Sequence, residues 1–127
     1  RMFSIDSAPT PQMEEDWARA LEAQRYLTEK LVPGADPQVL FADYNGYLAQ
    51  RGYRTEEGLF AYGQGYDNIE RPSLQPGESM KLACDMSMAV HTSLVDSRST
   101  IYCADSFLTQ GDGARRLHKT AQTLFRT

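Results

Sequence analysis

Residues 61–72 read AYGQGYDNIERP. Two glycines, one residue apart, lie between two tyrosines, and the stretch ends in Glu-Arg-Pro. Glycines in this arrangement indicate positive φ angles or a close approach of the backbone to a ligand. No glycine-rich helix start follows them, so the Gly-x-Gly pattern does not favour phosphate binding. We therefore expect a tight loop in which Gly63 and Gly65 are candidate substrate-binding residues.

The residues before this stretch predict two amphipathic helices. Each begins with a capping residue followed by proline, Thr-Pro at 10–11 and Asp-Pro at 36–37. The first helix is expected to end at the Val-Pro-Gly of residues 32–34, and the second at Gly52. Apolar side chains at helical spacing mark the faces expected to be buried: Met13, Trp17, Ala20, Leu21, Leu27 and Leu31 in the first helix, and Val39, Leu40, Tyr44, Tyr47 and Leu48 in the second.

Beyond Gly52 the apolar pattern predicts strands. Residues 1–5 and 59–62 read as short strands, residues 100–108 as a longer one, and residues 115–118 as a last short element. Between them, apolar residues alternate with mostly polar ones over residues 80–91, the period of a long strand or of one arm of a hairpin: Met80, Leu82, Cys84, Met86, Met88 and Val90. We expect one α+β unit over residues 1–127, with two helices followed by an antiparallel meander.

Composition excludes several classes of partner. The chain has 127 residues, of which 41% are hydrophobic and 24% charged, with a net charge of −4 and a pI near 5.1. Nucleic acid and anionic membrane are therefore disfavoured, because both require a basic surface. No stretch reaches the ~18 apolar residues of a membrane span, and no signal peptide is recognisable. Cys84 and Cys103 are expected to be reduced thiols in the core, which suits the cytoplasm. The first residue is Arg, which indicates processing or a piece of a longer chain.

Five motifs in collinear order extend the interpretation. They are LVPGA at 31–35, RGY at 51–53, YGQGYDNIERP at 62–72, QPGESMKLACDM at 75–86 and FLTQGDGARRL at 107–117. Together they resemble the C-terminal part of the pita-bread fold of the creatinase, prolidase and methionine aminopeptidase family, and most of all the Xaa-Pro peptidases. The resemblance implies two helices packed on a mostly antiparallel, curved sheet.

The resemblance also implies a site for two metal ions held by five side chains. Two of these are aspartates that would precede residue 1, and the other three positions fall on Tyr62, Asp85 and Ala104. Tyr62 could bind a metal only as a phenolate, against its usual pKa near ~10. Asp85 offers a shorter carboxylate than glutamate, and Ala104 offers no ligand atom. We therefore expect no cofactor in this chain as it stands, and Mn, Co, Zn or Fe only if the family site survives.

Creatinase-like members of the resembled family work without a metal and use a histidine as acid and base. If the alternation over residues 80–91 holds, His91 shares a strand face with Lys81, Asp85 and Ser87. One interpretation is that Asp85 orients His91 for proton transfer. The other is a solvent-facing polar edge of the sheet.

Glu70 and Arg71 complete the candidate site. An arginine pairs well with a substrate carboxylate, and a local ion pair is the alternative. The candidate catalytic residues are thus His91, Glu70 and Tyr62, and Arg71 joins the two glycines as a candidate for substrate binding.

Three functions remain open. The first is part of a hydrolase of the Xaa-Pro peptidase or creatinase type that acts on a peptide or small amide with an eroded metal site. The second is a non-catalytic pseudo-enzyme that serves as a binding or scaffolding protein. The third is a different hydrolase or lyase chemistry on the same fold. Because half of a pita-bread would expose a sheet edge and an apolar face, we expect a homo-oligomer such as a dimer, or a missing N-terminal half.

Overall fold

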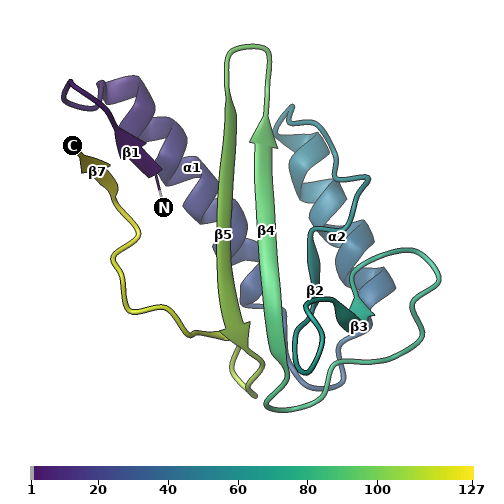
Figure 1. Ribbon diagram of the computed structural model, residues 1–127. Helices are drawn as coiled ribbons and strands as arrows, with labels where there is room; N and C mark the ends of the chain where they lie inside the picture. Colours follow the sequence, from purple (N-terminus) through teal and green to yellow (C-terminus); the bar gives the residue numbers. More distant parts are fainter. Residues whose placement is uncertain (1) are drawn as a thin grey trace.

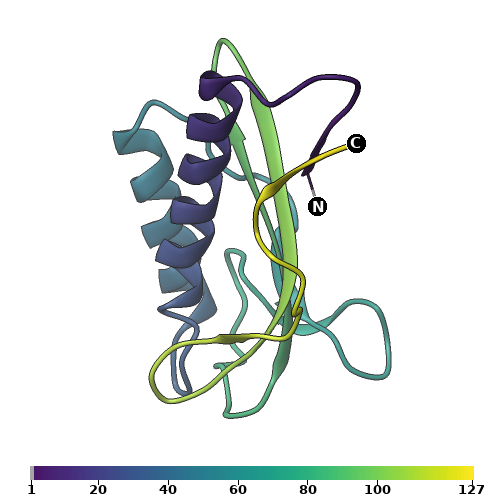
Figure 2. The same cartoon turned by 90° about the vertical axis from the view of Figure 1, so that its left-hand side faces the viewer.

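The computed structural model describes residues 2–127 and places two helices on one face of a five-stranded sheet (Figure 1). The strand order is β3-β2-β4-β5-β6, and every neighbouring pair is antiparallel. In the view turned by 90°, both helices lie on the same side of this sheet (Figure 2). The α+β class with a mostly antiparallel sheet is therefore confirmed. The elements are β1 (Met2–Ser4), α1 (Pro11–Thr28), α2 (Pro37–Gln50), β2 (Ala61–Gly63), β3 (Glu70–Ser73), β4 (Ser87–Val95), β5 (Thr100–Leu108), β6 (Arg115–Arg116) and β7 (Leu124–Arg126).

Both helices begin where the capping pattern predicts. The Thr10 hydroxyl accepts a hydrogen bond from the Met13 amide at 3.2 Å, and the Asp36 carboxylate accepts one from the Gln38 amide at 2.9 Å. Each bond satisfies an amide that the first turn of a helix leaves without a partner. The proline that follows each cap lacks an N–H, so it fits the first helical position without cost.

The core lies between the helices and the facing side of the sheet. Tyr44 and Leu48 of α2 are fully buried there, as the helical periodicity predicts. Two residues expected on the buried faces are instead exposed, Met13 by 40% and Val39 by 64%. The whole first turn around Met13 is exposed, and α1 first meets the core at Trp17, whereas in the first turn of α2 the buried residues are Pro37 and Leu40. The core residues include Trp17, Ala20, Leu27, Leu31, Leu40, Tyr47, Met88, Val90, Leu94, Ile101, Cys103 and Phe107.

The strand expected over residues 80–91 is only partly correct. Strand β4 starts at Ser87 and continues to Val95, while residues 80–86 form a connection outside the sheet. This connection is fixed by other partners: the Leu82 amide donates to Ala35 and the Asp85 amide to Thr109. The alternation at 80–86 thus reflects a buried Leu82 within an irregular segment, and not a pleated strand. Residues 100–108 form β5 as predicted.

Two strands have no counterpart among the expected elements. Strand β3 contains Pro72, which the edge of the sheet tolerates because an edge strand has no outer partner for an amide. Strand β7 pairs in parallel with β1, with Met2 opposite Leu124, and so joins the two ends of the described chain beside the main sheet (Figure 1). That pairing spans almost the whole chain and carries no local signal.

The two cysteines differ in their surroundings. Cys103 is buried in the core as expected, whereas Cys84 is exposed because it lies in the connection before β4. Cys84 is a free thiol. Over residues 2–127, no helix is long and apolar enough to cross a membrane.

Gly63 is the point where β2 and β3 come closest. A Cβ atom built on Gly63 would lie 2.9 Å from the carbonyl oxygen of Arg71 and 3.1 Å from that of Glu70. The register of the pair shifts between Tyr62 and Gly63, which is a bulge at this point. The group that approaches the backbone of Gly63 is β3 itself, and a close approach to a ligand stays a prediction.

We expect Gly63→Ala to lower the free energy of unfolding by about 1–3 kcal/mol, the usual cost of overpacking. The backbone of β3 would have to move to admit the methyl group. Gly58→Ala is the matched control, because a Cβ there meets nothing within 4 Å. Urea denaturation of both variants measures the difference, and equal stabilities would contradict the steric account.

Candidate functional site

The hairpin of β2 and β3 brings together the residues that the sequence singles out. Glu70 folds back over the loop that joins the strands, where its carboxylate accepts a hydrogen bond from the Asp67 amide at 2.7 Å. A Cβ atom on Gly65 would lie 2.6 Å from the same carboxylate. Gly65 therefore leaves room for Glu70, and the Glu70 carboxylate closes the loop. A direct role of either residue toward a substrate stays a prediction.

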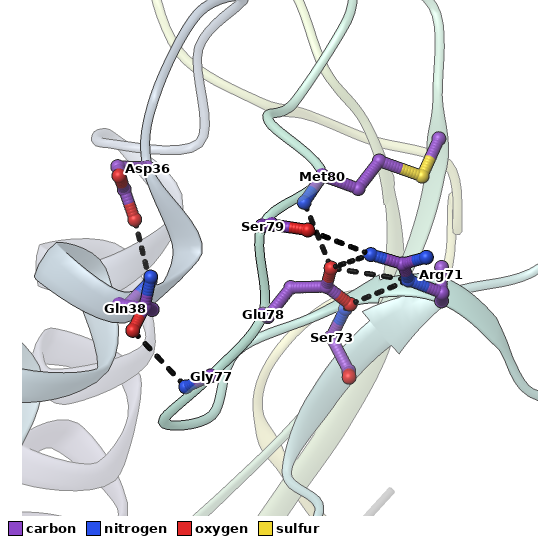
Figure 3. A network of polar contacts seen from close by, with 8 residues as sticks. All are labelled: Asp36, Gln38, Arg71, Ser73, Gly77, Glu78, Ser79 and Met80. Atoms are coloured by element: carbon purple, nitrogen blue, oxygen red, sulfur yellow. Dashed lines mark hydrogen bonds and ion pairs between the residues drawn. The ribbon is translucent and has the colours of Figure 1, made fainter.

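Arg71 pairs with Glu78 and not with its neighbour Glu70 (Figure 3). Its Nε donates to both carboxylate oxygens of Glu78, at 3.1 and 3.2 Å, and its Nη2 donates to the same carboxylate. The Ser73 and Met80 amides donate to this carboxylate as well, at 3.2 and 2.8 Å. The Glu78 side chain is 2% exposed, whereas that of Arg71 is 62% exposed.

These donors explain the electrostatics of the pair. The hydrogen bond from Arg71, followed by the bond from the Met80 amide, lowers the pKa of Glu78 to about 2. Glu78 therefore holds the loop between β3 and β4 in place and fixes the position of the Arg71 guanidinium. Sequence reasoning missed Glu78, because a glutamate after a Pro-Gly turn carries no signal of burial.

A second group lies on the sheet face away from the helices. Register places Tyr62 opposite Ala89, and His91 opposite Ala104. Opposed residues in a ladder share a face, and alternate residues of a strand return to it. Tyr62, Ala89, His91 and Ala104 therefore share this face, together with Tyr102. We call it the open face.

His91 is the centre of the open face. Its Nδ1 lies 2.7 Å from the Tyr102 hydroxyl, and its ring centroid lies 5.5 Å from that of Tyr62. Burial, and next the nearby Tyr62, raise the pKa of Tyr102, so its phenol stays protonated at neutral pH. Sequence reasoning missed Tyr102. The period-2 pattern could have suggested it, since Tyr102 lies two residues before Ala104.

Asp85 does not accompany His91, and this corrects the expected strand face. It lies two residues before β4 with φ at 59°, and Lys81 also precedes the strand. Ser87 and His91 do share a face of β4, four residues apart. Asp85 instead lines a cleft of about 330 Å³ together with Gly63, Glu70 and Arg71. The structure thus separates a charged cleft at the hairpin from the aromatic centre of the open face.

The three positions that the resemblance assigns to metal ligands do not fit a metal pair. Tyr62 packs against an imidazole, and Ala104 has no donor atom. The next residue, Asp105, cannot replace it, because Asp105 points to the other face and binds Arg116 at 2.8 Å. Over residues 2–127, no three His, Cys, Asp or Glu side chains are grouped so that they could hold a metal ion.

The buried carboxylate predicts an acid-sensitive loop. The folded pKa of Glu78 is about 2, below the ordinary value of 4.5, so its contribution is complete above about pH 4.5 and is lost as the pH falls toward 2. We expect Glu78→Gln to cost about 1–3 kcal/mol near neutral pH, and less as the pH approaches 2. Glu57→Gln, at an exposed position, is the control. Urea denaturation at several pH values measures both, and a pH-independent cost would contradict the ion pair.

Comparison with known proteins shows the family and the fold of the chain. The model of metallopeptidase family M24 matches residues 1–120. No curated protein sequence matches the chain. Three solved structures with similar folds illustrate the likeness. The X-Pro aminopeptidase from Thermotoga maritima is 17% identical, with 95% of this chain and 35% of that chain covered and a TM-score of 0.78.

The other two extend the range of similar folds. The dipeptidase PepE from Mycobacterium ulcerans is 20% identical, with 98% of this chain and 34% of that chain covered and a TM-score of 0.77. The methionine aminopeptidase from Rickettsia prowazekii is 13% identical, with 87% of this chain and 54% of that chain covered and a TM-score of 0.64. At these identities the structures establish the pita-bread fold, and the chain spans about a third of the length of the first two. Because the family model covers nearly all of its residues, the chain belongs to metallopeptidase family M24.

Proposed function

We propose that this chain is the C-terminal portion of an M24 protein that binds a peptide or a small amide at its open face without a pair of metal ions. The proposal rests on the residues that occupy the three positions which the family resemblance assigns to metal ligands. Tyr62 packs on His91, Ala104 has no ligand atom, and Asp85 lies in a turn outside the strand. A metal pair would need carboxylates and imidazole there.

The ligand class follows from the fold and from the chemistry of the face. The similar structures are described as an X-Pro aminopeptidase, prolidases and dipeptidases, names that refer to peptide substrates of those proteins. In this chain, the half-buried His91 and the 54% exposed Tyr102 offer hydrogen-bonding groups beside the Tyr62 ring. Such a surface suits an amide with a flat or apolar neighbour.

A binding protein without hydrolase activity is the function best supported. The second candidate is hydrolysis without a metal, with His91 as the acid and base. One specific observation favours it: Tyr102 fixes the imidazole by a hydrogen bond, as an oriented catalytic histidine requires. Asp85 has no part in this version, because it does not lie beside His91.

We further propose that the open face is covered in the working protein, either by an N-terminal half or by a second copy of the chain. The support is size and surface. The chain spans about a third of the length of its structural relatives, and Tyr102 of the open face is 54% exposed. An exposed free thiol at Cys84 is consistent with a reducing compartment, which we take to be the cytoplasm.

Metal content and affinity test the proposal. We expect elemental analysis of the purified chain to find no stoichiometric Mn, Co, Zn or Fe. Calorimetry with Mn²⁺ should give no binding tighter than about 1 mM. The double variant Tyr62→His with Ala104→Glu is the positive control, because it adds an imidazole and a carboxylate at two ligand positions. A wild-type chain that bound Mn²⁺ stoichiometrically would overturn the proposal.

Hydrolysis separates the two candidates. With EDTA present, the binding function predicts no cleavage of glycyl-proline by the wild-type chain. Cleavage that is lost in His91→Ala, and kept in His118→Ala, would establish the metal-free hydrolase instead.

A further inference from the structure

Three neighbouring strands hold the His91 imidazole. Tyr62 comes from β2, His91 from β4 and Tyr102 from β5. The Tyr62 ring is inclined by 59° to the imidazole, and the Tyr102 ring meets it nearly edge-on, at 79° and 5.9 Å between centroids. Ala104 lies directly opposite His91, and its small side chain leaves space for the imidazole ring. A side chain held in this way by regular elements is oriented before any ligand arrives.

The charged groups around His91 do not require an imidazolium. The groups that face it from the adjacent strands are two phenols, Tyr62 and Tyr102. The Glu56 carboxylate, from the segment before β2, accepts hydrogen bonds from the Ser93 amide at 3.0 Å and from the Ser93 hydroxyl at 2.8 Å. No ion pair of His91 exists within residues 2–127, whereas His118 lies 3.9 Å from Asp105. In a neutral imidazole, one ring nitrogen donates a hydrogen bond and the other accepts one.

The contact with Tyr102 decides which nitrogen carries the proton. A phenol is a good donor, and the Tyr102 hydroxyl lies 2.7 Å from Nδ1. If the hydroxyl donates, Nδ1 accepts and the ring proton is on Nε2. We propose that Tyr102 holds His91 as the Nε2–H tautomer, so that Nε2 is a fixed hydrogen-bond donor for the carbonyl oxygen of a bound peptide or amide. The carbonyl-binding role rests on the proposed function, whereas the tautomer does not.

With the proton on Nε2, His91 gives the open face a hydrogen-bond donor for a carbonyl oxygen. This donor lies near the positions where the family resemblance would place metal ligands. A metal polarises a carbonyl as a Lewis acid. A neutral imidazole N–H binds the same oxygen more weakly and adds no charge, which suits recognition of an amide. Tyr102 is then a positioning residue that acts through His91.

Nitrogen-15 NMR of the histidine rings tests the tautomer on the unliganded full chain. The chain has two histidines, so His118 serves as an internal reference. The spectra are recorded at about pH 8.5, two units above the ordinary imidazole pKa of ~6.5. We expect the Nε2–H pattern for His91 in the wild type, and a measurable Nδ1–H population in Tyr102→Phe. Tyr66→Phe, at a fully exposed tyrosine, should change nothing.

An Nδ1–H pattern in the wild type, or identical His91 signals in Tyr102→Phe, would overturn the role of Tyr102. A change of the His118 signals would reveal a general disturbance of the fold. Tyr102 is 54% exposed, so its replacement by phenylalanine removes only a hydroxyl at the surface.

Titration with glycyl-proline tests the carbonyl role. We expect the dipeptide to shift the His91 ring signals, and Tyr102→Phe to weaken its binding about 2- to 10-fold, the value of one hydrogen bond. Binding that leaves the His91 signals unchanged would overturn the carbonyl role alone. No binding at all would overturn the carbonyl role together with the proposed function. The tautomer of His91 is tested separately, by the spectra of the unliganded chain.

Discussion

The close contact between the backbones of β2 and β3 at Gly63 positions both groups of side chains described above. A side chain at Gly63 would collide with the carbonyl of Arg71 at 2.9 Å, so the hairpin exists in this form only with glycine there. On one side the hairpin places Arg71 over the buried Glu78. On the other, β2 continues the sheet and places Tyr62 beside His91. One steric constraint thus supports the charged cleft and the aromatic open face.

The sequence predicts the elements whose signals are local. Capping residues with proline give the start of both helices, and the apolar pattern of residues 100–108 gives β5. The prediction at residues 80–86 is wrong because alternation also arises when a few side chains of a loop are buried, here Leu82. Strand β7 depends on a partner at the other end of the chain, and β3 depends on its position at the edge of the sheet. No local sequence pattern therefore predicts either strand.

The site divides in the same way. Tyr62, Gly63, Gly65 and the Glu-Arg pair stand out in the sequence because they form one short stretch. Their partners, Glu78 and Tyr102, do not, because burial of a carboxylate and the pairing of two strands are tertiary properties. Arg71 forms an ion pair with Glu78, and its role as a substrate clamp stays a prediction. The guanidinium lies at the edge of the cleft, and the Arg71 side chain is 62% exposed.

The central claim is that the open face binds a peptide or amide without metal ions, and backbone NMR with glycyl-proline in EDTA tests it most directly. We predict amide shifts concentrated in β2, β4 and β5 around Tyr62 and His91, unchanged when the diamagnetic ion Zn²⁺ replaces the EDTA. Shifts confined to the helices, or binding that appears only with Zn²⁺, would contradict the claim.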